Sequence, residues 1–130
     1  MDIFSTYAVD ETKEQSGTWM EVGDAKFLVA RAGNKNYVKM LGKEVEKNQK
    51  ALDRKDDAAD ALSDKIMIDV LASTILLGWE NVSFKGETLE YSKENAKMLL
   101  ALKEFRREIM KLADDFNAFK LAKEAEEVKN

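Results

Sequence analysis

The run from Ile66 to Trp79 constrains the fold of this chain more than any other stretch. It reads Ile-Met-Ile-Asp-Val-Leu-Ala-Ser-Thr-Ile-Leu-Leu-Gly-Trp. Its apolar residues lie on nearly every side of a helical wheel, and such a helix belongs at the centre of a domain or in a membrane. A helix that spans a bilayer needs about 20 apolar residues. This run is shorter and contains Asp69, so it does not fit a membrane span. It therefore predicts a buried central helix that ends at Gly78, since glycine favours the left-handed conformation that follows a helix.

Composition limits the chemistry that the chain can perform. With 130 residues, 45% hydrophobic and 35% charged, the chain fits one domain with a modest core and a strongly solvated surface. It has no cysteine and no histidine, which excludes disulfides, thiolate metal sites and the commonest general base. No phosphate-binding glycine loop or metal-spaced cluster is present. We therefore expect no enzyme, no cofactor and no metal, and we expect Asp69 to pair with a lysine or arginine or to lie at the helix edge.

The N-terminal part is predicted to contain a mobile arm and then a β-hairpin. Residues 1–17 are mostly polar and aperiodic, so we expect a loop or arm. Its start could be pinned to the body by Ile3, Phe4, Tyr7 and Val9. Residues 19–22 and 25–31 alternate in polarity and read as two strands about a tight turn in which Gly23 takes positive φ. Because a lone hairpin is marginal, one of its faces must lie on helices.

The next predicted helix begins after an N-cap at Asn34 or Asn36 and carries a basic stripe. One face carries apolar residues at helical spacing, and another carries a lysine at every fourth position, namely Lys35, Lys39, Lys43 and Lys47. This stripe is compatible with a solvated face whose stems cover apolar surface, or with a docking stripe for an acidic partner. A sequence pI near 5.0 argues against a dedicated nucleic-acid binder.

The C-terminal half shows the clearest periodicity. Asp56 or Asp57 is expected to open the central helix, the chain reverses at Lys85-Gly86, and Ser92 caps the following helix. Apolar residues then alternate spacings of four and three, a heptad seam made of Met98, Leu102, Phe105, Ile109, Leu112, Phe116 and Phe119. The seam is compatible with intramolecular packing or with self-association, and with one helix or with two that break near Lys103.

Together these patterns predict a mainly α fold with a small β-hairpin, an α+β arrangement. About four helices are expected to form a bundle around the central buried helix. We expect a mobile N-terminal arm at 1–17, a single globular helical domain at 18–121 and a charged tail at 122–130. Nothing at the N-terminus resembles a signal peptide, so the expected compartment is the cytoplasm.

Several strings of the sequence resemble a family of tail assembly chaperones from long-tailed bacteriophages. The central strings are Gly78-Trp79-Glu80-Asn81-Val82, the glycine turn at Gly86 and Tyr91-Ser92-Lys93-Glu94-Asn95-Ala96. Flanking strings are Trp19-Met20-Glu21-Val22, Phe27-Leu28-Val29-Ala30-Arg31 and Ala113-Asp114-Asp115-Phe116-Asn117. The resemblance covers the chain from about Gly17 to Phe119. The sequence departs from the family where a proline is expected near Leu89-Glu90, which affects the local path of that corner.

This resemblance implies a non-enzymatic protein that binds the tape measure protein, shields its apolar helices and recruits subunits of the major tail protein. It also implies the host cell cytoplasm and absence from the mature virion. Because a tape measure protein is expected to present amphipathic helices, the chaperone should offer them an apolar groove. The candidate groove residues are Phe105, Ile109, Phe116 and Phe119, with Lys35, Lys39, Lys43 and Lys47 steering acidic partners.

Two other classes of function compete with this interpretation. One is a structural head-to-tail connector or tail subunit of the virion, which would be present in purified particles. The other is a small regulator that binds nucleic acid through the lysine stripe, which would show strongly salt-dependent DNA binding.

Overall fold

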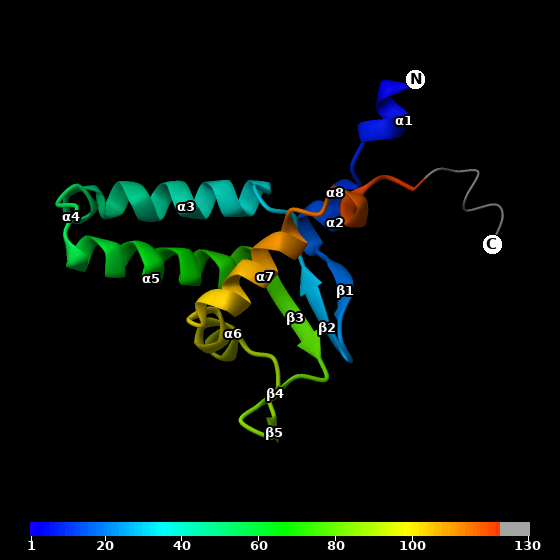
Figure 1. Cartoon of the computed structure of the whole chain (residues 1–130). Helices are drawn as coiled ribbons and strands as arrows, with labels where there is room; N and C mark the ends of the chain where they lie inside the picture. The colour runs from blue at the N-terminus through cyan, green and yellow to red at the C-terminus, as the bar shows by residue number, and fades with distance from the viewer. Residues whose placement is uncertain (123–130) are drawn as a thin grey trace.

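The computed structural model describes residues 1–122, so the predicted charged tail lies almost entirely outside the described residues. Figure 1 shows the chain as helices gathered beside a small sheet. The helices are α1 (Ile3–Tyr7), α2 (Glu11–Ser16), α3 (Lys35–Lys47), α4 (Gln49–Leu52), α5 (Asp57–Thr74), α6 (Lys93–Leu100), α7 (Lys103–Ala113) and α8 (Phe116–Phe119). The strands are β1 (Thr18–Val22), β2 (Ala25–Val29), β3 (Leu76–Glu80), β4 (Ser83–Phe84) and β5 (Glu87–Thr88). The predicted mainly α fold with a small antiparallel sheet is confirmed.

The predicted hairpin is confirmed, and it has a third strand that the prediction missed. β1 and β2 pair antiparallel about a turn in which Gly23 has a φ of 62°, and β3 adds antiparallel to β2. Met20, Phe27 and Trp79 are neighbours across the three strands and are all buried. The sheet therefore directs one row of large side chains into the core, as the two-residue period of a strand requires.

The predicted central helix is confirmed in its first part and wrong in its last part. α5 begins after Asp56, whose carboxylate accepts the backbone N–H of Ala59 at 2.8 Å, but it ends at Thr74. The residues that follow form β3, so Gly78 lies within a strand and does not end a helix. A short apolar run fits a buried strand and a buried helix equally well, and pairing with β2 decides between them here.

Gly78 has a packing role in the sheet. It pairs with Leu28, and a Cβ on Gly78 would lie 3.4 Å from the Leu28 Cβ and 3.6 Å from the Trp19 Cη2. The side chains of Leu28 and Trp19 therefore occupy the space above the glycine. Trp19 remains 49% exposed on the sheet face opposite the buried row of Met20 and Phe27.

Two antiparallel helices, α3 and α5, form a long hairpin that projects from the sheet (Figure 1). The predicted cap at Asn34 is confirmed, because its side-chain oxygen accepts the backbone N–H of Tyr37 at 3.0 Å. The same amide donates to the Thr74 carbonyl at 3.2 Å, which fixes the start of α3 to the end of α5. The Asp69 carboxylate pairs with Lys65 at 3.2 Å and with Lys97 at 3.6 Å, as expected.

The C-terminal seam is divided among three helices. Ser92 caps α6 as predicted, by accepting the backbone N–H of Asn95 at 3.0 Å, and the helix ends at Leu100. α7 begins at Lys103, which confirms the alternative of a break near that residue. Leu102, at the break, is 53% exposed and therefore does not continue a buried seam.

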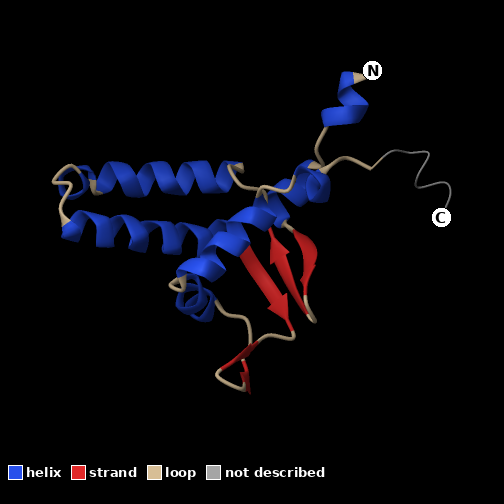
Figure 2. Cartoon of the chain, in the orientation of Figure 1, coloured by secondary structure: helices blue, strands red, loops and turns tan. Residues whose placement is uncertain are grey.

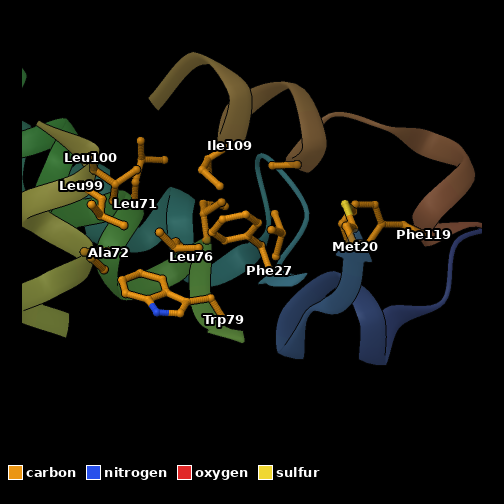
Figure 3. Packing of buried hydrophobic residues seen from close by; sticks show 14 residues of the cluster. Met20, Phe27, Leu71, Ala72, Leu76, Trp79, Leu99, Leu100, Ile109 and Phe119 are labelled. Atoms are coloured by element: carbon orange, nitrogen blue, oxygen red, sulfur yellow. The ribbon is translucent and has the colours of Figure 1, made fainter. Parts of the chain in front are cut away.

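The core lies between the sheet and the helices. The prediction had instead placed the core inside a bundle of helices around the central helix. Figure 2 shows the three-stranded sheet beside the helices, with the small β4–β5 ribbon apart from it. Figure 3 shows Leu71, Leu99 and Leu100 at one end of the core and Met20 facing Phe119 at the other. All five belong to one continuous buried cluster. The sheet thus supplies one side of the core, since a sheet with an apolar face must be covered by another layer.

The N-terminal residues were predicted to form a loop or arm, but in the structure they form the short helices α1 and α2. The backbone N–H of Asp10 donates to the Phe119 carbonyl at 2.8 Å, and that of Arg31 donates to the Glu14 carbonyl at 3.0 Å. These bonds attach α2 to the body of the domain. The Asp10 carboxylate also accepts the backbone N–H of Thr12 at 3.0 Å and caps α2. The cap stabilises a helix in this polar segment, which has no apolar periodicity.

Candidate partner-binding surface

The four predicted seam residues do not form one groove. Ile109 and Phe119 are fully buried in the core, where no partner can reach them. Phe105 is half-buried, and its ring centroid lies 5.6 Å from that of Phe27. Phe116 is also half-buried, but it lies on α8, at the end of the molecule that carries α1. Phe105 lines a separate pocket with Phe27 and Val82, and Phe116 lies beside Tyr7 of α1.

The predicted lysine stripe is exposed along its whole length. Lys35, Lys39, Lys43 and Lys47 all lie on α3, and none forms an ion pair within residues 1–122. Val38 beside them is 60% exposed. Figure 1 shows α3 running away from α8, so the structure separates the lysine stripe from the aromatic residues with which it was grouped.

An open apolar groove lies around α1, in the segment predicted to be an arm. Ile3, Phe4 and Tyr7 are 63%, 71% and 58% exposed, although the prediction allowed them to pin the arm to the body. Together with Val9 and Leu121 they line a groove of about 580 Å³. Grouped exposed apolar side chains of this size mark a site of interaction more often than isolated ones do. We call this surface the α1 groove.

Local hydrogen bonds hold the walls of the α1 groove. The Asp2 carboxylate accepts the backbone N–H of Ser5 at 2.7 Å and caps α1; this bond lowers the pKa of Asp2 below its ordinary value. On the opposite wall, the Leu121 N–H donates to the Ala8 carbonyl at 2.9 Å, and Val9 forms an antiparallel bridge with Lys120. The groove is therefore built from both ends of the described chain.

Phe116 connects the α1 groove to the core. Its ring centroid lies 6.3 Å from that of Tyr7, and the Arg31 guanidinium lies 5.8 Å from the Phe116 ring. The same guanidinium lies 5.4 Å from the ring of buried Phe119, so one cation contacts both aromatic residues of α8. Arg31 thereby fixes α8 and positions Phe116 beside the groove.

A sequence signal for this groove exists, but it is short. Asp2 is a favourable N-cap, and Ile3, Phe4 and Tyr7 follow at spacings of one and three, which place them on one side of a helical turn. A single turn gives too few residues for a periodicity test. Only the fold reveals that these side chains stay exposed.

Within residues 1–122 there is no group of three or more acidic side chains arranged to hold a metal ion. Nor does any helix in that range have the length and apolar character to cross a membrane. The α1 groove is lined by apolar side chains and by two carboxylates, Asp10 and Glu11, and its geometry suits the binding of an apolar segment of another molecule.

A family model matches most of the chain. The family model described as YdaY prophage protein matches residues 32–130, which include α3 and everything after it. The match leaves out the α1 groove residues of the N-terminal segment and the β1–β2 hairpin. No curated protein and no solved structure matches the chain. Because the family model covers more than half of the chain, this is a phage-derived protein that belongs to the YdaY prophage protein family.

Proposed function

We propose that this prophage protein is a tail assembly chaperone that binds the tape measure protein and recruits tail tube subunits. It acts in the host cell cytoplasm and is left out of the mature virion. The observation that carries the proposal is the α1 groove, in which Ile3, Phe4 and Tyr7 are each more than half exposed on one helix. Phage descent of the chain and its resemblance to tail assembly chaperones add support.

The mechanism is burial of an apolar helix face. A tape measure helix that is amphipathic exposes an apolar stripe until the tail tube surrounds it, and such a stripe aggregates in water. The α1 groove covers part of the stripe, with Phe4 and Tyr7 as aromatic anchors and Phe116 behind Tyr7. Aromatic anchors of this kind contribute most of the binding energy of an interface.

Recruitment of tail tube subunits uses a second surface. The lysine stripe of α3 is exposed. Lys35 lines a small pocket with Glu11, but α3 then runs away from α1, so Lys39, Lys43 and Lys47 can be occupied together with the α1 groove. Lysines at four-residue spacing steer an acidic partner through long-range attraction. We assign the major tail protein to this stripe.

The test is co-expression with the tape measure protein encoded nearby, scored by its soluble fraction and by co-purification. The wild-type chain should keep the tape measure protein soluble, and Phe4→Ser with Tyr7→Ser should abolish this effect. Leu102→Ser is the matched control, because Leu102 is 53% exposed and lies outside the groove. An insoluble tape measure protein beside a chain that purifies alone would refute the proposal. Presence of the chain in purified particles would instead favour a head-to-tail connector or another structural subunit of the virion.

A further inference from the structure

We infer that the α1 groove selects basic amphipathic helices, in which lysines or arginines flank the apolar face. The inference rests on the proposed function for the identity of the client, and it adds the charge that the client must carry. Its evidence is the combination of an apolar groove with two charged lining residues that are both acidic.

The apolar lining of the groove selects a helix that has an apolar face. Ile3, Phe4, Tyr7, Val9 and Leu121 supply its lining. No residue of α1 is buried; Tyr7 contacts Phe116 on one side, and Ile3 and Phe4 stay more than half exposed. An amphipathic helix laid in a groove of this type presents anchors at positions i, i+3 or i+4, and i+7.

The charged part of the groove is entirely acidic. Asp10 and Glu11 are its only charged lining residues in the described chain, and Asp2 stands directly before Ile3. Asp2 and Asp10 each accept backbone N–H groups as helix caps. Glu11 is exposed and forms no ion pair within residues 1–122.

Other acids of the N-terminal segment lie nearby. Of the acids in α1, α2 and their caps, Asp10 and Glu11 line the groove, while Asp2 and Glu14 do not. Lys13, and Lys120 whose backbone bridges Val9, are not among the lining residues. A client with acidic flanks would meet like charges at the rim, whereas basic flanks would gain attraction and a faster association rate. The complementarity therefore favours lysine- or arginine-flanked helices over acidic ones and over nucleic acid.

A second copy of the chain is the main competing occupant. Its α3 carries the lysine stripe beside exposed Val38, so it presents positive charge next to one apolar side chain. A single exposed valine gives too little apolar area to fill a groove lined by Phe4 and Tyr7. The α1 of a second copy offers more apolar area, but it brings the same acids, Asp10 and Glu11, against those of the first copy. A client helix with a full apolar face fits better, and the experiment below separates the two occupants.

The experiment measures binding of labelled helical peptides to the full chain by fluorescence anisotropy. Two peptides share one apolar face, and their flanks carry either four lysines or four glutamates. We expect the lysine peptide to bind at least about tenfold more tightly at low salt, and the difference to shrink as salt screens the rim. Glu11→Lys should weaken the lysine peptide about two- to fivefold, as expected for one exposed charge pair. Phe4→Ser should abolish binding of both peptides.

Glu87→Lys is the matched charge control. Glu87 is an exposed acid on β5, far from the α1 groove (Figure 1), so its reversal should leave the affinity unchanged. Equal affinities for the two peptides, or equal effects of Glu11→Lys and Glu87→Lys, would overturn the inference. A dimer of the chain in sedimentation would also overturn it, if Phe4→Ser dissociates the dimer and the lysine peptide does not. In that case a second copy of the chain would occupy the groove.

The failure of this inference and that of the proposed function give different results. If the tape measure protein becomes soluble but neither flank charge nor Glu11→Lys matters, the chaperone function stands and the charge selection is wrong. If the lysine peptide binds selectively while the tape measure protein stays insoluble, the groove has the inferred selectivity and its client is a different protein.

Discussion

Replacement of the two phenylalanines of α8 by alanine should have clearly different effects on stability. Phe119 is fully buried in the core cluster, and Phe116 is half-buried beside Tyr7. Truncation of a fully buried phenylalanine costs about 3–5 kcal/mol, because the apolar contact is lost and a cavity remains. For a half-buried ring, which leaves no closed cavity, we expect about 1–2 kcal/mol.

The assay is urea unfolding followed by tryptophan fluorescence. Trp79 is buried among core residues and reports the loss of the core, while half-exposed Trp19 contributes a smaller change. With a urea dependence of about 1.5 kcal/mol per molar for a domain of this size, Phe119→Ala should lower the unfolding midpoint by about 2–3 M. Phe116→Ala should lower it by about 0.7–1.3 M.

The same pair of variants separates stability from binding. Phe116→Ala should stay folded and still lower the capacity to keep the tape measure protein soluble, because Phe116 supports Tyr7 in the α1 groove. Equal midpoints for the two variants would refute the assignment of Phe119 to the core. A larger loss of stability in Phe116→Ala would refute the assignment of Phe116 to the groove.

Three further changes test the local structure. Asn34→Ala should destabilise the domain by about 2 kcal/mol in urea unfolding, because a helix cap is lost and the Thr74 carbonyl loses its side-chain donor; an unchanged midpoint would contradict this. Lys85→Gly should raise the free energy of unfolding by about 0.5–1 kcal/mol, since Lys85 has a φ of 52°; a loss of stability would contradict it. Burial raises the pKa of Tyr91, whose hydroxyl donates to the Leu76 carbonyl at 2.9 Å. Its contribution to stability is therefore complete below the ordinary pKa of 10.0 and is lost as the pH rises through the raised value. An ultraviolet titration should show one tyrosine ionising above pH 10, and Tyr91→Phe should remove that transition.

The caps and turns were predictable from the sequence because each depends on a few neighbouring residues. Asn34, Asp56 and Ser92 accept backbone N–H groups at helix starts, as their residue types predict. Gly23 and Gly86 both take positive φ at chain reversals. The mainly α composition of the fold and the starts of α3, α5 and α6 followed from these local signals, whereas α7 begins after Leu102 without a side-chain cap.

The partner surface could not be predicted in the same way, because exposure depends on what the rest of the chain covers. Phe105, Ile109 and Phe119 look alike in a heptad pattern, but the sheet and α6 cover them to different extents. Two exposed aromatic residues, Phe4 and Tyr7, lie instead on α1, in a segment with too few residues to show a period.

The run from Ile66 to Trp79 separates what the sequence determines from what only the tertiary structure determines. The sequence by itself determined that this run is buried, since so many consecutive apolar side chains can only be accommodated in a core. Only the tertiary structure decided that the run changes from helix to strand after Thr74, because the strand forms by pairing with β2, whose residues are about fifty positions away in the chain. Hydrophobicity is a property of each residue, whereas strand pairing is a property of two distant segments that the fold brings together.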